Sequence, residues 1–282
     1  MGDWITFWDS DHTIYVSACH RDVHFRTIAE DIVGYVPSPT ATILDYGCGE
    51  ALYADRIAAK AGRLVLVEAA PTVRAKLVAR FASQGRIDVK APEELAAVPD
   101  RSIDVAIVNS VTQYLTGPEL DGLIAGFGRL LRPTGLLLLG DVIPPHVSAV
   151  RDAVALLRFA ALHGFLVVAV GGLLATVLSD YWRLRSRLGL SRYSEAEMIR
   201  RLAAAGFSGT RAATNIGHNQ ARMTFLARPC QQLSDSPATL EGVAAAADNE
   251  PAAATAAGVG PTPRPPESGV ARCGLSSTVI LR

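Results

Sequence analysis

Two acidic residues and two glycines form the most informative spacing in this sequence. Asp45 is followed by Gly47 and Gly49, and Glu68 comes 23 residues after Asp45. Glycine allows a backbone to turn sharply and to approach a ligand without a Cβ in the way. A carboxylate such as that of Glu68 accepts hydrogen bonds from both hydroxyls of a ribose. The spacing therefore predicts a backbone turn beside a nucleoside-binding carboxylate.

The elements around these residues place them at one edge of a parallel sheet. Ile43 and Leu44 are typical of the end of a buried strand, and Glu50–Lys60 contains helix-forming residues. The free N–H groups at the start of such a helix favour polar ligand groups. The continuous apolar run Arg63–Val67 predicts a second strand, covered on both faces, that ends at Glu68. Taken alone, Glu68 also fits a solvated strand end.

The glycine turn differs from a dinucleotide-binding fingerprint. The pattern G-x-G-x-x-G starting at Gly47 would need glycine at position 52, where the sequence has Leu52. An acid two residues before the first glycine would also repel a pyrophosphate. The turn instead resembles the first motif of the class I S-adenosylmethionine (SAM) methyltransferases through Asp45, Gly47, Cys48 and Gly49. Ala51 stands where that family usually has a third glycine.

This resemblance implies a set of cofactor contacts. Asp45 would face the positively charged aminoacyl and sulfonium end of SAM, and Gly47 and Gly49 would let the backbone pass beside it. Glu68, with Ala69 after it, would lie at the ribose. The cofactor implied is thus SAM, and the chemistry implied is methyl transfer.

Two later strand ends continue the pattern. The stretch Ile87–Lys90 predicts a third strand, and in similar proteins the loop after it carries an acid that meets the adenine amino group. That acid is missing or displaced here, so we expect backbone groups around Ala91 to serve instead. The stretch Ser102–Val108 predicts a fourth strand. It ends at Asn109, near the expected position of the methyl group, although Asn109 could equally cap the turn, and Tyr114 follows on the acceptor side.

The remaining strands carry further acceptor-side candidates. A run of leucines predicts a fifth strand that ends at Asp141. Strands at Thr210–Ile216 and Arg222–Arg228 would form an antiparallel hairpin whose turn holds His218. A titratable imidazole at that turn suits a base for a hydroxyl acceptor, and a surface histidine is the alternative. His12, in the N-terminal arm, is a weaker candidate.

A helical region over 146–193 interrupts the pattern before the last two strands. Within it, Phe159–Leu178 holds twenty residues whose only ionisable side chain is His163. Its length would suffice to cross a bilayer, but glycines interrupt it and the domain is completed only after it. We favour a lid packed on the domain, or part of a substrate pocket, as the role of this stretch. A helix at a membrane interface is the second alternative, and a helix that crosses the bilayer is the third. Aromatic and arginine residues that extend this region to 159–187 suggest peripheral membrane contact.

Composition narrows the class of partner. The formal net charge of the 282 residues is zero, so no global field favours nucleic acid. His20 and His24 lie four residues apart on a predicted helix over Ser17–Val36, but no third metal ligand is suggested nearby. The cysteines have no C-x-x-C spacing. We therefore expect no metal site. The acidic, aromatic N-terminus does not resemble a signal peptide, which favours a cytoplasmic location.

We therefore expect an α/β fold with a Rossmann-like, seven-stranded, mostly parallel sheet, helices on both faces, and a helical insertion before the last two strands. Residues 1–39 would form an N-terminal helical arm, 40–230 the methyltransferase domain, and 231–282 a disordered Ala/Pro-rich tail. The predicted function is SAM-dependent methyl transfer to a small-molecule or lipid-like acceptor. The alternatives are an NAD(P)-dependent oxidoreductase and a non-catalytic, membrane-associated SAM-binding protein.

Overall fold

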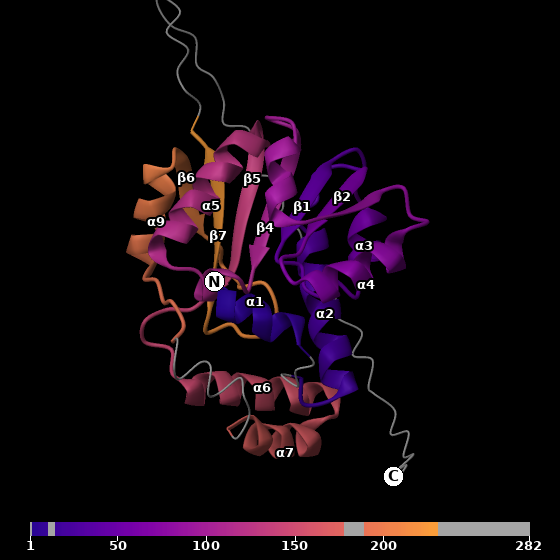
Figure 1. The fold of residues 1–282 in the computed structure, drawn as a ribbon. Coiled ribbons are helices and arrows are strands. Elements are labelled where there is room, and N and C mark those ends of the chain that lie inside the picture. Colours follow the sequence, from indigo (N-terminus) through magenta and orange to yellow (C-terminus); the bar gives the residue numbers. More distant parts are fainter. Residues whose placement is uncertain (1, 11–14, 178–188, 231–282) are drawn as a thin grey trace, which may run out of the picture.

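A computed structural model describes residues 2–10, 15–177 and 189–230, and a seven-stranded sheet lies at its centre (Figure 1). The strands are β1 (Thr42–Tyr46), β2 (Arg63–Val67), β3 (Ile87–Lys90), β4 (Ile103–Asn109), β5 (Leu131–Val142), β6 (Phe207–Arg211) and β7 (Met223–Pro229). Their order is β3-β2-β1-β4-β5-β7-β6, with β7 antiparallel to both its neighbours and the other pairs parallel. The expected mostly parallel, Rossmann-like sheet is confirmed.

Helices cover both faces of this sheet. The helices of the described residues are α1 (Gly2–Asp9), α2 (Ala18–Val33), α3 (Ala54–Ala58), α4 (Pro71–Phe81), α5 (Gly117–Leu130), α6 (Ala149–His163), α7 (Leu166–Val177) and α9 (Glu195–Ala204), with short 3₁₀ turns η1 (Pro92–Ala97) and η2 (Thr112–Tyr114). Residues of α2, α3 and α4 pack on one face, and residues of α5 and α9 on the other.

The central strands are apolar on both sides because each must fill both of these cores. Leu44 of β1 and Val65 of β2 pack on the side of α5 and α9, whereas Ile43 and Leu64 pack on the side of α2. Successive strand residues point to opposite faces, so a run of apolar residues is what a strand covered on both sides requires. The parallel register then brings the carboxyl ends of β1, β2, β4 and β5 to one edge.

Two local predictions are wrong in their bounds. Helix α3 spans only Ala54–Ala58, because Ala51 has a φ of 42° and lies in a turn that delays the helix expected over Glu50–Lys60. Strand β6 spans Phe207–Arg211, where it pairs with β7, and residues 212–216 lie in the loop.

Within the described residues, the insertion contains helices α6 and α7. Helix α6 ends at Gly164, whose left-handed φ of 80° reverses the chain, and α7 begins two residues later. Figure 1 shows α1 and α2 lying across the end of the sheet to which β4 points, with the α6–α7 hairpin beyond them. None of the helices within the described residues has the length and apolar character needed to cross a bilayer. The expected tail at 231–282, the arginine-rich stretch at 181–187, and His12 lie outside the described residues.

Candidate active site

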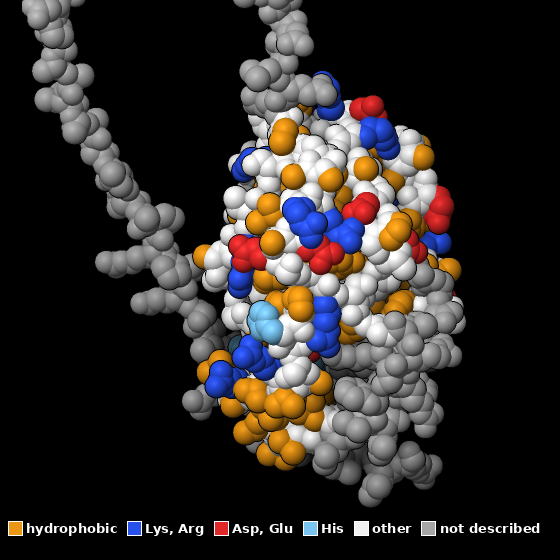
Figure 2. Space-filling view, turned by 90° about the vertical axis from the view of Figure 1, so that its left-hand side faces the viewer, with side chains coloured by type: hydrophobic (Ala, Val, Ile, Leu, Met, Phe, Trp, Pro, Cys, Tyr) orange, Lys and Arg blue, Asp and Glu red, His pale blue; other side chains and the backbone are white. Residues whose placement is uncertain are grey.

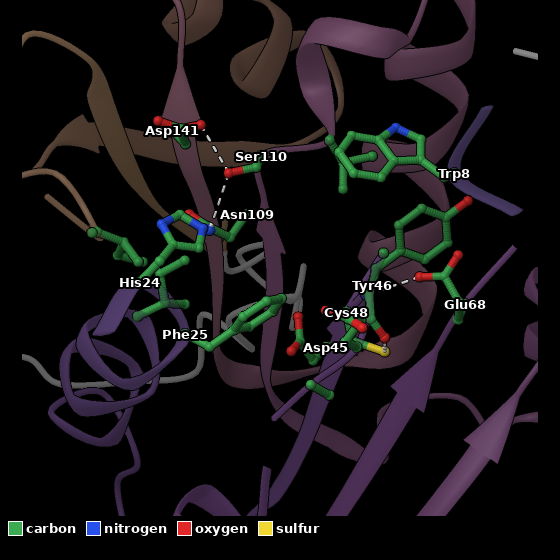
Figure 3. A pocket seen from close by; sticks show the side chains of 18 of the residues that line it. Trp8, His24, Phe25, Asp45, Tyr46, Cys48, Glu68, Asn109, Ser110 and Asp141 are labelled. Atoms are coloured by element: carbon green, nitrogen blue, oxygen red, sulfur yellow. Dashed lines mark hydrogen bonds between the residues drawn. The ribbon is translucent and has the colours of Figure 1, made fainter. Parts of the chain in front are cut away.

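One cavity of about 430 Å³ lies at the carboxyl ends of the parallel strands. It is lined by most of the residues that the sequence singled out, namely Asp45, Gly47, Gly49, Glu68, Ala69, Asn109, Tyr114, Asp141 and His218. Figure 3 shows His24, Asn109 and Asp141 toward one end of this cavity, and Tyr46 and Glu68 toward the other. The two carboxylates Asp45 and Glu68 therefore share one cavity, as the spacing predicted.

The glycine turn leaves β1 in a conformation that suits glycine alone. Gly47 has a φ of 71° and Gly49 a φ of 56°. A Cβ on Gly47 would lie 2.4 Å from Cγ2 of Val111, so no side chain fits there. A Cβ on Gly49 would meet no atom within 4 Å, because this part of the turn opens onto the cavity. The first glycine thus serves packing, and the second exposes the backbone to a ligand.

Ala51 also adopts a left-handed conformation, with a φ of 42°, although it carries a Cβ. A left-handed residue other than glycine costs roughly 1 kcal/mol. We therefore expect Ala51→Gly to raise the free energy of unfolding by about 1 kcal/mol. The matched control is Ala59→Gly at the end of α3, where φ is −66° and glycine offers no relief. Urea unfolding should show that Ala51→Gly stabilises the protein and that Ala59→Gly destabilises it. Destabilisation by both variants would contradict a strained backbone at Ala51.

Asp45 and Glu68 differ in how their charge is satisfied. Desolvation by burial, with a smaller contribution from Glu68, raises the pKa of Asp45 to about 7. Within the described residues Asp45 has no ion-pair partner. Glu68 accepts hydrogen bonds from the N–H groups of Gly49 and Ala70, each at 2.8 Å, and burial raises its pKa. A cationic group beside Asp45 and hydroxyls beside Glu68 would satisfy both carboxylates, which fits SAM.

The expected adenine contact is arranged differently. Ala91 is not part of the cavity lining, and its N–H donates to Oε2 of Glu94 at 2.6 Å. That N–H is therefore engaged in capping η1 rather than available to adenine, which corrects the prediction for this group. Pro92, the next residue, lines the cavity instead.

The ends of β4 and β5 meet in a strained, hydrogen-bonded pair. Ser110 and Asp141 each have a φ of 59°, and Oγ of Ser110 donates to Oδ2 of Asp141 at 2.8 Å (Figure 3). Arg222 donates to the same carboxylate oxygen at 2.9 Å and to Asp152 of α6 at 3.1 Å. Strained non-glycine residues persist only where their surroundings hold them, and they concentrate at functional sites. The sequence did not single out Ser110, Arg222 or Asp152.

Three histidine rings gather at the same end of the cavity. The ring of His218 stacks on Phe159 with centroids 4.4 Å apart, and lies 5.7 Å from His24 and 6.4 Å from His20. Burial lowers the pKa of His218, and lowers those of His24 and His20 to about 3 and about 4. All three imidazoles are therefore neutral near pH 7. Within the described residues no group of histidine, cysteine or acidic side chains is arranged to hold a metal ion.

Several polar atoms on the cavity wall have no partner within the described residues. They are Oδ1 of Asn109, Oε1 of Gln113 and Nδ1 of His24, all buried. A buried polar atom without a hydrogen bond costs about 1–3 kcal/mol, so each is a candidate contact for a bound molecule. Asn109 also donates to Oγ of Ser110 at 3.3 Å, so it holds the end of β4 while its carbonyl oxygen remains unpaired.

Helix α1 closes the cavity with aromatic rings. Trp4 and Trp8 pack on Tyr114 with ring centroids 4.6 Å and 5.7 Å apart, and all three line the cavity. Tyr114 therefore forms part of an aromatic wall of the cavity. The sequence predicted an arm laid on the domain, but the contact between Trp4 and Tyr114 joins residues more than a hundred positions apart and had no local signal.

A family model described as a methyltransferase domain matches residues 44–139. This segment is a SAM-dependent methyltransferase domain. This replaces the alternative of a nicotinamide-dependent oxidoreductase. The matched segment holds the glycine turn, Glu68 and Asn109, while the acceptor-side residues Asp141 and His218 lie outside it.

Known proteins resemble this methyltransferase over part or most of its length. Nocamycin O-methyltransferase from Saccharothrix syringae is 32% identical over 166 residues, covering 52% of this chain and 58% of the relative. The chain thus spans little more than half of that relative. The DhpI–SAH complex structure is 13% identical, with 81% of this chain and 96% of that chain covered and a TM-score of 0.52. A SAM-dependent methyltransferase structure from Leishmania major is 12% identical, with 80% and 81% covered and a TM-score of 0.52. Both structures share the fold.

Proposed function

We propose that this protein transfers the methyl group of SAM to a hydroxyl oxygen of a small, largely apolar acceptor. The observation that carries the proposal is the continuous cavity, which joins the Asp45–Glu68 end to an end lined by aromatic rings and neutral histidines. When bound, SAM supplies an electrophilic methyl group on a sulfonium. Because this donor is already activated, the protein mainly has to align the acceptor and exclude water.

On the cofactor side, charge and hydrogen bonding select the ligand. Asp45 would balance the positive charge of the aminoacyl and sulfonium end, and Gly49 would let the backbone lie against it. Glu68 would accept hydrogen bonds from the ribose hydroxyls, since each of its oxygens retains acceptor capacity beyond the backbone N–H that it already binds.

On the acceptor side, His218 is the group best placed to accept a proton. Its ring is held against Phe159, and burial keeps it neutral near pH 7, the form that can act as a base. Tyr114, with Trp4 and Trp8, would form the surface against which an apolar acceptor packs. Ser110 and Asp141 would fix the wall beside the reacting hydroxyl.

The relative from Saccharothrix syringae supports this choice of acceptor. Its description names it an O-methyltransferase of nocamycin, a small molecule, and it is 32% identical over the aligned residues. The zero net charge of the chain and the aromatic wall of the cavity agree with a small acceptor rather than a nucleic acid.

The test is to incubate the full chain with methyl-labelled SAM and a small-molecule extract of the cells that contain it, and to identify labelled products by mass spectrometry. A product labelled on oxygen supports the proposal. Label on carbon or nitrogen would contradict the oxygen assignment while leaving methyl transfer in place. SAM binding by calorimetry without any labelled product would favour the non-catalytic binding protein instead.

A further inference from the structure

The large apolar side chains that are exposed within the described part of the chain are concentrated on one helical hairpin. Among the described residues, the large hydrophobic side chains that are exposed are Val78, Val150, Val154, Leu162, Leu166, Val167, Val168 and Val170. All except Val78 belong to α6 and α7 or to the turn between them. Figure 2 shows this apolar patch at the end of the molecule that the hairpin forms. Contiguous exposed apolar patches mark interaction surfaces, whereas single exposed residues do not.

The patch does not arise from loose packing of the hairpin. Phe159 of α6 and Phe165 and Ala169 at α7 are buried together against Val23 of α2. The opposite surface of α7 is exposed, with Val167 at 87% and Val170 at 48%. The hairpin thus has one apolar side packed on the protein and a second apolar side left facing outward.

The charges around the patch are positive. Arg151 and Arg158 of α6 are exposed, and α7 has no charged residue between Leu166 and Val177. The only acid on the two helices is Asp152, whose carboxylate accepts hydrogen bonds from Arg222 and Asn219 on the interior side. Figure 2 shows Lys and Arg side chains bordering the apolar patch. An apolar surface bordered by arginines complements an anionic lipid headgroup region.

We propose that the outer surface of the α6–α7 hairpin, defined by Leu162, Leu166, Val167 and Val170 and bordered by Arg151 and Arg158, docks the protein on an anionic membrane surface. The apolar side chains enter the boundary between headgroups and acyl chains, and the two arginines lie among the headgroups. The hairpin lies in the interface plane, because neither helix is long enough to cross the bilayer.

This docking would bring the acceptor end of the cavity close to the membrane. Leu156 of α6 lines the cavity, and Phe159 of α6 holds the ring of His218. The helix that carries the outer patch therefore also forms a wall of the acceptor end. An apolar acceptor dissolved in the membrane would have a short path to the cavity.

The experiment is flotation of the full chain with phosphatidylcholine vesicles, with and without phosphatidylglycerol. We expect flotation with the anionic vesicles that weakens as salt is added. The double variant Leu162→Asp/Val167→Asp should bind the anionic vesicles roughly ten-fold more weakly, or more weakly still, because two apolar side chains are no longer transferred from water into the membrane. Replacing either Arg151 or Arg158 alone by glutamine should weaken binding to the anionic vesicles roughly five-fold. Val78→Asp, at the exposed apolar residue outside the patch, is the matched control and should float as the wild type does.

Other results would overturn the proposal. Flotation that is absent with every vesicle, or that is unchanged in Leu162→Asp/Val167→Asp, excludes this surface as a membrane contact. A wild-type dimer by light scattering that the same variant dissociates, without vesicle binding, assigns the surface to a second copy of the chain. The wild type and all of these surface variants should bind SAM with equal affinity, because none of the changed residues lines the cavity. The SAM affinity therefore distinguishes a failure of membrane docking from a failure of the methyltransferase site.

Discussion

Replacing Asp45 by asparagine is expected to weaken SAM binding by roughly ten- to a hundred-fold, because the variant loses the negative charge that we propose balances the cationic end of the cofactor. The same change should stabilise the ligand-free protein at pH 8. Burial raises the pKa of Asp45 from 3.8 to about 7, so the ionised carboxylate is unfavourable in the folded state, and asparagine removes that cost. Calorimetric titration with SAM and thermal unfolding without it measure the two effects.

The sign of the pH dependence follows from this shift. Between the unfolded pKa of 3.8 and the folded pKa of about 7, the folded state holds more protons, so stability of the wild type falls as pH rises through this range. SAM affinity changes in the opposite direction, rising as pH rises through about 7, because a cation binds the ionised form. Both dependences should be reduced in Asp45→Asn.

Asp55→Asn is the matched control for this prediction. Asp55 is an exposed acid on α3 that does not line the cavity, so its loss should leave SAM affinity unchanged. Equal weakening of SAM binding in both variants would indicate a general charge effect. Unchanged affinity in Asp45→Asn would remove Asp45 from the cofactor site.

Replacing His218 by asparagine is expected to lower kcat by roughly a hundred- to a thousand-fold on the acceptor identified by labelling, since a positioned general base contributes on this order. KM for SAM should change little, because the ring of His218 lies 5.7 Å from that of His24, which Figure 3 shows toward the other end of the cavity from Glu68. Steady-state kinetics in which SAM is varied at saturating acceptor measures both quantities, and kcat, which refers to saturating SAM, does not contain the contribution of Asp45 to SAM binding.

The pH profile distinguishes a base from a structural ring. Burial lowers the pKa of His218 below its usual 6.5, so the wild-type kcat should be constant above that pH and fall below it as the imidazole is protonated. This decline should disappear in His218→Asn. His163→Asn is the control, since the ring of His163 also packs on Phe159, at 4.6 Å, but does not line the cavity. Equal loss of kcat in both variants would show that disturbed packing of Phe159, and not a lost base, explains the effect.

Much of the cofactor end was predictable because it depends on local spacing. Asp45 lies at the end of one buried strand and Glu68 directly follows the next. Parallel neighbours end at the same edge, so the two acids had to meet once the strands were correctly placed. The contact expected at Ala91 was less predictable. It depended on whether the Ala91 N–H was free to meet a ligand. In the structure this N–H donates a hydrogen bond to the carboxylate of Glu94, three residues later.

The acceptor end depends on contacts between distant segments. The bond from Arg222 to Asp141 spans 81 residues, and that from Asn219 to Asp152 spans 67. The packing of α1 on Tyr114 and the stacking of His218 on Phe159 are of the same kind. No periodicity or spacing in the sequence encodes such pairs, so the sequence could offer His218 and Tyr114 only as separate candidates.

The sequence by itself determined the parallel sheet, the glycine turn and the two carboxylates, because strand burial and turn chemistry are set by residues close together in the chain. The tertiary structure alone decided that the three histidines face one another, that Ser110 and Asp141 share a strained corner, and that an apolar stretch of twenty residues reverses at Gly164. That reversal places one side of the hairpin against Val23 and leaves the other facing outward. Hydrophobicity fixes how much of a segment seeks burial, but only the packing of distant elements fixes which side remains exposed.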